Sequence, residues 1–327
     1  MKRAINRRKF GVDFLAAAAA ALPILPRVAR AQSYPTRPVR IVVGFPPGSG
    51  PDIVARLTAQ WLSERFGQQF IVDNQPGASG NIGTETVVRA HADGYTLLLV
   101  TSGNAIDASL YPNLNFNFLH DIAPTASVAT APFVMVVNSS FPAQTVPEFI
   151  AYAKANPGKI NMASVGNGSA PQVFGELFMM MTGVDLVSVS YRGNYLPDLL
   201  AGQVQVLFGS ITQSIALVRT GKLRALAVTT ATRLEVLPDV PTVAEFVPGY
   251  EAGGWYGIGV PKNTSAEIIA TLNHEITAAT SDPQMKARLI DLGLEPRTMT
   301  PTEFGTFIAD ETEKWAKVIK FANIKAE

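Results

Sequence analysis

Short hydrophobic runs alternate along the chain with amphipathic segments, and this alternation predicts an α/β fold. The runs are rich in β-branched and aromatic residues and are bounded by Gly, Pro, Asn or Ser, as strands are. We expect strands at 39–45, 69–72, 95–100, 133–137, 186–189, 204–208 and 223–228. The apolar spacing between the first two runs predicts a helix over 53–66, whose buried face comprises Ile53, Val54, Leu57, Trp61 and Leu62.

Several helix starts are marked by a threonine with a glutamate three positions later, the spacing of a capping box. These pairs are Thr145/Glu148, Thr242/Glu245, Thr264/Glu267 and Thr300/Glu303. The last helix carries an apolar stripe that predicts docking on a domain body, formed by Phe304, Phe307, Ile308, Trp315, Val318 and Ile319. We find no internal repeat or low-complexity tract after the N-terminal segment.

A chain of 327 residues is long enough for two domains. No long flexible linker is present, so the chain must pass between them by short crossings, which we expect at Ala131-Pro132 and Gly253-Gly254. Domain 1 would comprise 33–132 plus 253–327, and domain 2 would comprise 133–252. A clamshell built in this way has a cleft between its lobes, where ligands commonly bind.

Residues 1–31 have the pattern of an export signal. Arg7-Arg8-Lys9-Phe10 resembles a twin-arginine region, the run 14–22 is apolar, and Ala29-Arg30-Ala31 offers a small-x-small cleavage site. A membrane anchor is the alternative, but the run is shorter than the roughly 20 residues that span a bilayer. We expect cleavage near Ala31 and a periplasmic protein, with the twin-arginine and general export routes both open.

Composition and charge exclude several classes of function. The net charge is +1, but seven basic residues and one acidic residue lie in 1–31, which leaves about −5 on the remainder. Without a basic stripe we expect no nucleic-acid partner. The absence of cysteine excludes thiol catalysis, thiolate metal sites and disulfides. The three histidines have no ligand spacing, and we expect them at the surface: His91, His120 and His274.

Two glycine-rich turns, at 44–52 and 72–81, each follow a predicted strand and precede a helix. Glycine allows a ligand to approach the backbone, and a helix N-terminus offers unpaired N–H groups and the positive end of the dipole. Together they predict an anion site. Neither turn has the lysine or the spacing of a nucleotide loop, so we expect no nucleotide cofactor. Asp52 would repel an anion, unless it serves as a partner of the helix dipole.

Two further segments rich in hydroxyls and glycine, 101–104 and 164–169, also follow strands. Four such turns at the carboxyl ends of strands predict a shared crevice. A dinucleotide pattern nearly appears at 166–171, with Pro171 in place of its third glycine, and a hydrolase elbow nearly appears around Ser79. No carboxylate pair or metal-ligand cluster stands out.

Two questions stay open at this point. An exported α/β hydrolase with Ser79 or Ser169 as nucleophile is the alternative function, although no histidine lies near either serine in sequence. Trp255 and Tyr256 follow the second crossing, where an aromatic side chain could close over a ligand or could simply pack.

The chain resembles the periplasmic solute-binding receptors of the tripartite tricarboxylate transporter family, also called Bug receptors. The resemblance covers essentially the whole chain after the signal, in order. It rests on the stretches 34–40, 45–56, 74–83, 93–98, 105–106 with 109–111, 154–159, 164–168, 202–206, 221–228, 237–245 and 255–257.

The resemblance implies a two-lobed periplasmic-binding-protein fold, type II-like, that closes on a small organic acid without enzymatic activity, cofactor or metal. It also implies that the two glycine-rich turns grip one carboxylate through backbone amides and water, and that membrane components of the transporter are partners of a monomeric receptor. The candidate ligand-binding residues are Pro47, Gly48, Ser49, Gly50, Asp52, Ala78, Ser79, Gly80, Thr101, Ser102, Asn104, Ser164, Gly168, Ser169, Gln172, Tyr191, Gly209, Ser210 and Trp255.

Two positions depart from the family pattern. Family members often carry a histidine where Gln172 stands and an aspartate where Gly209 stands. Loss of that acid removes a partner for an ammonium group and opens space. We therefore hypothesise a ligand without an amine, either a dicarboxylate or an aromatic acid.

Overall fold

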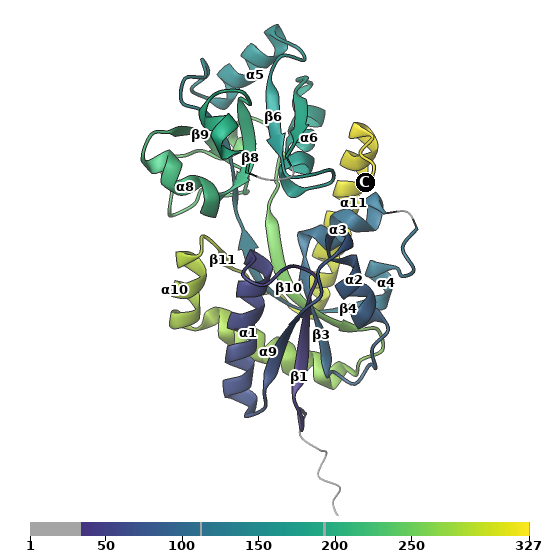
Figure 1. Cartoon of the computed structure of the whole chain (residues 1–327). Coiled ribbons are helices and arrows are strands. Elements are labelled where there is room, and N and C mark those ends of the chain that lie inside the picture. Colours follow the sequence, from purple (N-terminus) through teal and green to yellow (C-terminus); the bar gives the residue numbers. More distant parts are fainter. Residues whose placement is uncertain (1–33, 112, 192–193, 327) are drawn as a thin grey trace, which may run out of the picture. The chain divides into compact units, whose positions relative to one another are not determined.

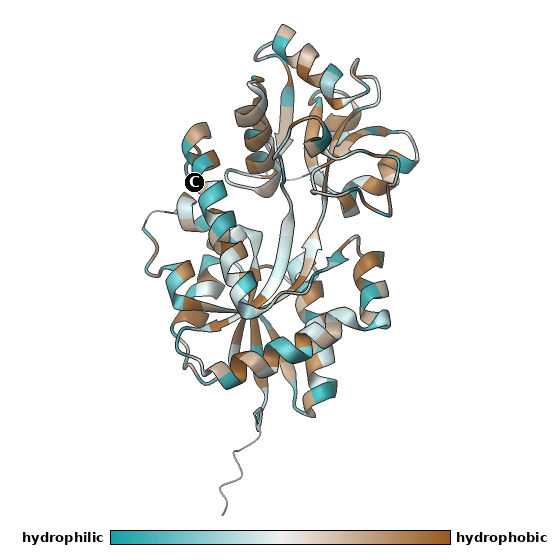
Figure 2. Ribbon diagram, turned by 180° about the vertical axis from the view of Figure 1, so that it is seen from behind, coloured by the Kyte–Doolittle hydropathy of each residue, from teal (hydrophilic) through white to brown (hydrophobic). Residues whose placement is uncertain are grey.

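The computed structural model describes residues 34–111, 113–191 and 194–326, so the predicted export signal lies outside the described residues. Within these ranges two mixed sheets are present (Figure 1). The first has the order β11-β4-β10-β3-β1-β2 and the second β7-β6-β8-β5-β9. Figure 2 shows that apolar residues gather on the strands and on the helix faces that cover them.

The first sheet consists of β1 (Val39–Val43), β2 (Phe70–Asn74), β3 (Thr96–Thr101), β4 (Ile122–Ala131), β10 (Gly254–Pro261) and β11 (Glu295–Pro296). Its lobe also holds α1 (Gly50–Phe66), η1 (Ala78–Gly80), α2 (Asn81–Val88), α3 (Ser102–Leu110), α4 (Phe118–Asp121), α9 (Ala266–Ser281), α10 (Pro283–Asp291) and α11 (Pro301–Ala322).

The second sheet consists of β5 (Phe133–Asn138), β6 (Asn161–Ser164), β7 (Val187–Ser190), β8 (Val206–Ser210) and β9 (Leu223–Val228). Its lobe also holds α5 (Val146–Ala155), α6 (Ala170–Thr182), α7 (Leu196–Leu200), α8 (Ile211–Arg219) and η2 (Val243–Glu245). The chain leaves the first sheet at the end of β4, enters the second at the start of β5 and is back in the first at β10.

Strand directions place four helix starts at the sheet edges that matter for function. β1 pairs in parallel with β2 and β3, and β6 pairs in parallel with β7 and β8. Parallel strands bring their carboxyl ends to one edge of a sheet. The helices α1, α3, α6 and α8 follow β1, β3, β6 and β8 directly, so each lobe presents two helix N-termini at its edge.

The predicted strands are confirmed to within two residues at each end, but β4, β6, β10 and β11 were not predicted. β4 is built largely of Ala, Thr and Ser, which carry little strand signal. β10 contains Gly257, which usually argues against a strand. A Cβ at Gly257 would lie 2.6 Å from the Ala126 carbonyl oxygen and would overlap the Phe304 ring, so this strand needs glycine for close packing.

Two capping boxes are confirmed in full, Thr242/Glu245 and Thr300/Glu303. Thr145 also caps its helix, although the Glu148 carboxylate accepts from Gln144. The prediction at Thr264 is wrong. Ser265 caps that helix instead, while the Thr264 hydroxyl donates to the Pro261 carbonyl.

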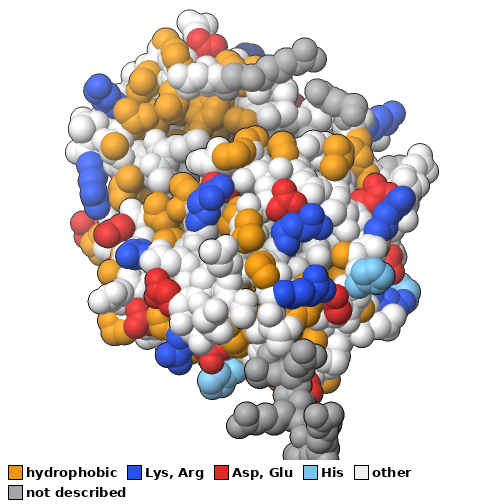
Figure 3. All heavy atoms as spheres, turned by 60° about the horizontal axis from the view of Figure 1, so that its bottom comes forward, with side chains coloured by type: hydrophobic (Ala, Val, Ile, Leu, Met, Phe, Trp, Pro, Cys, Tyr) orange, Lys and Arg blue, Asp and Glu red, His pale blue; other side chains and the backbone are white. Residues whose placement is uncertain are grey.

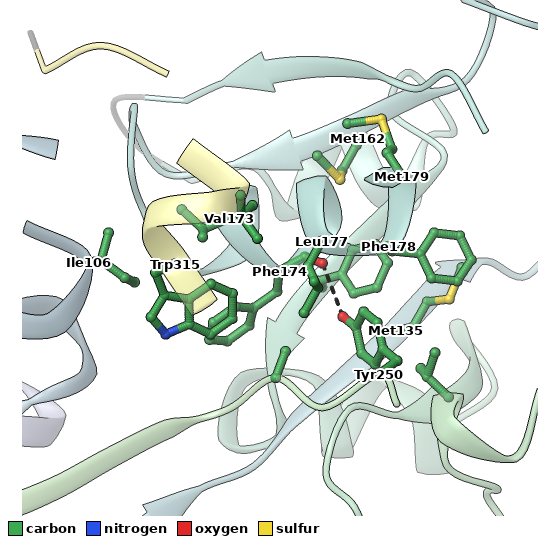
Figure 4. Packing of buried hydrophobic residues seen from close by; sticks show 14 of the residues in the cluster. Ile106, Met135, Met162, Val173, Phe174, Leu177, Phe178, Met179, Tyr250 and Trp315 are labelled. Atoms are coloured by element: carbon green, nitrogen blue, oxygen red, sulfur yellow. Dashed lines mark hydrogen bonds between the residues drawn. The ribbon is translucent and has the colours of Figure 1, made fainter. Parts of the chain in front are cut away.

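One apolar core is continuous between the two sheets, and α11 is part of it. The ring of Phe174 on α6 lies 5.1 Å from the ring of Trp315 on α11, and Tyr250 donates to the Phe174 carbonyl (Figure 4). The stripe on α11 therefore docks as predicted, but on both lobes rather than on one.

The buried carboxylate of Glu311 fixes α11 against the second crossing. Its Oε2 accepts from the indole nitrogens of Trp255, at 3.2 Å, and Trp315, at 3.1 Å. Lys314 pairs with the other oxygen of the same carboxylate. A buried carboxylate with donors on both oxygens is well compensated, so this contact fixes α11 against β10 within the first lobe.

The described surface carries charges of both signs. Figure 3 shows one face, on which basic and acidic side chains are interspersed rather than gathered into a patch. None of the helices in the described residues has the length and apolar character needed to cross a membrane.

We predict that Trp315→Ala lowers the free energy of unfolding by about 3–5 kcal/mol, because it empties a large site in the shared core. Denaturant unfolding followed by circular dichroism measures this. Lys317→Ala, on the exposed side of the same helix, is the control and should cost under about 0.5 kcal/mol. A Trp315→Ala variant within 1 kcal/mol of the parent would contradict a core shared by both lobes.

Candidate functional site

The two glycine-rich turns of the first lobe touch backbone to backbone. A Cβ on Gly44 would lie 2.6 Å from the Cα of Gly80, and one on Gly83 would lie 3.1 Å from the Cα of Gly44. Any side chain at Gly44 would push the turns apart, so glycine here sets their spacing.

Asp52 joins the same two turns through its side chain. This carboxylate, 1% exposed, accepts from the Gly48 backbone N–H at 2.8 Å and from Asn74 Nδ2 at 2.8 Å. Arg56 completes the set from the next helical turn, with its Nε 2.9 Å from the carboxylate. Asn74 also donates to the Phe45 carbonyl at 3.1 Å. Asp52 thus stabilises the two turns and does not line the cleft, so it is not placed to repel a bound ligand.

The electrostatics of Asp52 agree with this role. Burial would raise its pKa, but the hydrogen bonds from Arg56, Gly48 and Asn74 outweigh burial and hold the pKa below its ordinary value. The carboxylate is therefore ionised whenever the fold is intact near neutral pH. Its negative charge is already satisfied by three donors.

The second lobe repeats the first turn. Gly48-Ser49-Gly50-Pro51 opens α1 and Gly168-Ser169-Ala170-Pro171 opens α6. Gly48 and Gly168 have φ of 78° and 74°, and in each turn the serine is the residue that caps the helix in extended conformation.

In each turn the side chain four residues after the first glycine accepts a hydrogen bond from the N–H group of that glycine. Gln172 Oε1 accepts from the Gly168 N–H at 2.8 Å, as Asp52 does from Gly48. We found no repeat from the sequence because only the short G-S-x-P motif is shared. The fold shows that the two copies occupy equivalent places.

A cleft of about 360 Å³ lies between the lobes at these turns. A second hollow of about 360 Å³ adjoins it and shares Pro51, Ala131, Phe133 and Tyr256. The first is bordered by the starts of α3 and α6, and the second by the starts of α1 and α8. The first N–H groups of a helix have no partner within the helix, so the four helix starts bring backbone donors and positive dipole ends to the borders of the two hollows.

Cationic side chains are absent from this space. Among the described residues that line the two hollows there is no Lys, Arg or His, and Asp107 is the one carboxyl group. Tyr256 lines both hollows, and burial raises its pKa to about 12, so its phenol stays neutral. No cluster of metal-binding side chains is found in the described part of the chain. An anion here would be held by neutral donors and helix dipoles.

The structure brings eight of the predicted site residues to the cleft and the adjoining hollow. Those that line it are Gly48, Gly50, Ser79, Thr101, Ser102, Gly168, Ser169 and Ser210. Ala78 and Ser79 have φ of 46° and 57°, a left-handed conformation that non-glycine residues rarely adopt. Pro47, Ser49 and Gly80 belong to the same turns without lining either hollow.

Other predicted residues have structural partners instead. Asn104 completes a capping box with Thr101 and donates to Thr84, and Gln172 supports its turn. Ser164 donates to the Val189 carbonyl and Tyr191 to Asp198. Trp255, 2% exposed, packs on Phe304 and Phe307 and donates to Glu311, so it does not reach the cleft.

The expectation that Gly209 opens space is wrong. Gly209 is buried within β8, and a Cβ there would lie 2.7 Å from Leu207 Cδ2 and 3.1 Å from the Ser214 hydroxyl. Those two side chains therefore occupy the space around a Cβ at this position. Gly209 lines neither hollow among the described residues.

Several lining residues are missing from the candidate set, among them Tyr256 and Asp107. The candidate set contains Trp255 rather than its neighbour Tyr256. Neighbouring residues on a strand point to opposite faces, and the sequence does not show which face meets the cleft. Asp107 was missed because it is the one carboxyl group in α3, and a single carboxyl group in a short helix gives no pattern. A search for carboxyl groups just beyond the predicted turns would have found it.

Comparison with known proteins identifies the family. The model described as tripartite tricarboxylate transporter family receptor (TctC) matches residues 54–324. The chain belongs to this receptor family. Protein BugT of Bordetella pertussis is 35% identical over 317 residues, covering 95% of this chain and 96% of BugT.

Solved structures of similar proteins agree with the observed fold. Rpa4515 of R. palustris with adipate has a TM-score of 0.76 and 36% identity, over 89% of this chain and 99% of that one. Periplasmic binding protein BugD has a TM-score of 0.73 and 33% identity, over 90% of this chain and 100% of BugD. MatC of Rhodopseudomonas palustris with bound malate has a TM-score of 0.73 and 29% identity, over 88% of this chain and 100% of MatC.

These findings confirm the two-lobed α/β binding-protein fold and the receptor family. The family comprises periplasmic binding receptors, so the protein is not an enzyme. The hydrolase alternative also lacks a histidine that could act as the general base for either serine. His91, His120 and His274 are all exposed, and none lines the cleft beside Ser79 or Ser169.

We predict that Asp52→Asn lowers the free energy of unfolding by about 1–3 kcal/mol at pH 7, because it weakens charge-assisted hydrogen bonds at a buried site. The folded-state pKa lies below the unfolded value, so this contribution is present above about pH 4 and is lost as pH falls through the folded pKa. Urea unfolding between pH 3 and 7 measures the difference. The exposed Asp310→Asn is the control, and an equal loss at pH 3 and pH 7 would contradict the assignment.

Proposed function

We propose that the protein is an exported receptor that captures a small organic carboxylate in the cleft between its lobes. It then delivers this ligand to the membrane components of a tripartite tricarboxylate-type transporter. Residues 1–31 act as the export signal, cleavage occurs near Ala31, and the receptor is a periplasmic monomer. The observation that carries the proposal is a cleft where four helix starts converge without a cationic side chain among its described lining residues.

The proposed ligand class follows from the chemistry of the lining. A carboxylate accepts several hydrogen bonds, and each bond from a neutral donor to a charged acceptor contributes roughly 1.5–3 kcal/mol. Three or four such bonds offset an association cost of roughly 4–15 kcal/mol only when the donors are already in place. The rigid turns behind Gly48 and Gly168 supply that preorganisation.

The second end of the ligand is proposed to meet the other lobe. The relatives solved with adipate and malate each hold an acid with two carboxylates. In this chain both lobes present the same G-S-x-P turn, which suits a ligand with an oxygen-rich group at each end. We therefore favour a dicarboxylate, with an aromatic acid as the second candidate, over an amino acid.

We predict that the purified receptor binds at least one of adipate, malate or benzoate with a dissociation constant in the micromolar range, and binds glutamate more weakly. Isothermal titration calorimetry measures both. A ligand present at about 100 times its dissociation constant should add about 2.7 kcal/mol to stability, so a thermal-shift panel of acids provides the first screen. Selective binding of amino acids or of organic cations would overturn the ligand class.

We predict that Gly168→Ala weakens binding of the best acid by about tenfold or more, because the new Cβ would overlap Leu110 of the other lobe. Gly48→Ala is a matched control. It has the same positive φ and the same turn, but nothing lies within 4 Å of its Cβ, so it should show the smaller loss that backbone strain alone causes.

Leu110→Ala in the Gly168→Ala background should restore most of the affinity, since it removes the side chain that the new methyl group meets. Equal losses for Gly168→Ala and Gly48→Ala would show that approach of the lobes at this point does not contribute to binding.

A further inference from the structure

Asp107 is a buried carboxyl group that the ligand site, as described so far, does not use. It lies on α3, lines the cleft beside Ser79 and Ser102, and is 3% exposed. Asn81 Nδ2 donates to its Oδ2 at 3.2 Å. No other side-chain or backbone hydrogen bond to Asp107 through its carboxyl group is found among the described residues.

The second oxygen of Asp107 has no hydrogen-bond partner among the described residues and is not sealed from solvent. Two polar side-chain atoms in the described part of the chain are sealed from solvent and have no hydrogen-bond partner, the hydroxyls of Ser188 and Ser214. Oδ1 of Asp107 is not among these atoms, so it is open to solvent. The hollow that Asp107 lines is the cleft. A buried polar atom with one open side is placed to meet a ligand.

The surroundings of Asp107 favour its neutral form. Burial raises its pKa to about 8, and the hydrogen bond from Asn81 opposes this only in part. The elements packed against α3 are α2, α4, α11, β3, β10 and η1. The ionisable groups on these elements include Glu85, His120, Asp121, Tyr256, Glu311 and Lys314.

These neighbouring groups do not supply a charge partner. Glu85 pairs with Arg89, Glu311 pairs with Lys314, and His120 and Asp121 pair with each other at the surface. Tyr256 is neutral. An ionised Asp107 would therefore stand beside an anionic ligand without a cation between them, which is unfavourable in a partly dry cleft.

We propose that Asp107 is a specificity-determining residue that contacts the ligand as a neutral carboxylic acid. Oδ2 accepts from Asn81, and the proton on Oδ1 is donated to a carboxylate oxygen of the ligand. This deepens the proposed function and rests on it. A protonated acid adds a strong donor without adding positive charge, so it selects oxygen acceptors over ammonium groups at this position.

The first test is the pH dependence of adipate binding, measured by calorimetry between pH 7 and 9.5, where both carboxyl groups of adipate are ionised. The neutral form of Asp107 binds, so affinity is constant while Asp107 is protonated and falls as pH rises through about 8. Above that pH the dissociation constant should rise by about tenfold per pH unit, as expected for one linked proton. If adipate proves not to bind, the tightest acid of the panel takes its place.

Two variants at the same position separate donation from packing. Asp107→Asn keeps the shape, can accept from Asn81 through its oxygen and can donate to the ligand through its amide. It should bind within about threefold of the parent at pH 7 and lose the pH dependence. Asp107→Ala removes the donor and should bind about tenfold more weakly, also without pH dependence. Circular dichroism and the thermal midpoint verify that each variant folds.

Glu176→Gln is the matched control. Glu176 is also a buried carboxyl group whose pKa burial raises, to about 7, but it lies in α6 and does not line the cleft. This variant should keep the pH profile of the parent. If Glu176→Gln removes the profile, or Asp107→Asn keeps it, the assignment to Asp107 is wrong.

The outcomes distinguish this inference from the proposed function. Binding of a carboxylate with a flat pH profile would overturn the role of Asp107 and leave the receptor function standing. Tighter binding of glutamate than of adipate, with affinity that rises with pH, would show that Asp107 acts as a carboxylate toward an ammonium group. Failure of every acid in the panel to bind would overturn the proposed function itself.

Discussion

The site depends on one buried carboxylate, that of Asp52. It holds the Gly48 N–H, the Asn74 amide and the Arg56 guanidinium at once, and so fixes the turn after β1 against the turn after β2. Without these bonds the glycine-rich backbone would be free to adopt many conformations, and the two turns would not keep fixed positions at the cleft. The turns that border the cleft are therefore held in place by a side chain that does not itself line the cleft.

The same solution appears in the second lobe with a neutral side chain. Gln172 takes the place of Asp52 and holds Gly168 as Asp52 holds Gly48. The two lobes thus meet with equivalent turns, while the shared core around Trp255, Trp315 and Glu311 joins them at the base. A binding protein needs lobes that are each rigid and are joined by few elements, and this arrangement provides both.

The sequence was sufficient for the strands rich in β-branched residues, for three helix caps and for the family. It was insufficient where a position is decided by a distant neighbour. Gly257 sits in a strand because Ala126 and Phe304 leave no room for a side chain. Gly209 opens no space because Leu207 and Ser214 fill it. Trp255 and Tyr256 were indistinguishable until the strand register showed which one faces the cleft. Local patterns report backbone preferences, whereas these outcomes depend on long-range packing.

The most direct test of the account is a crystal structure of the receptor with the tightest-binding acid of the panel. The account predicts a carboxylate in the cleft with its oxygens within hydrogen-bonding distance of the backbone N–H group of Ser79 or of backbone N–H groups at the starts of α1, α3 or α6. A carboxylate that is held instead by lysine or arginine side chains, or that lies outside the space between the lobes, would contradict it.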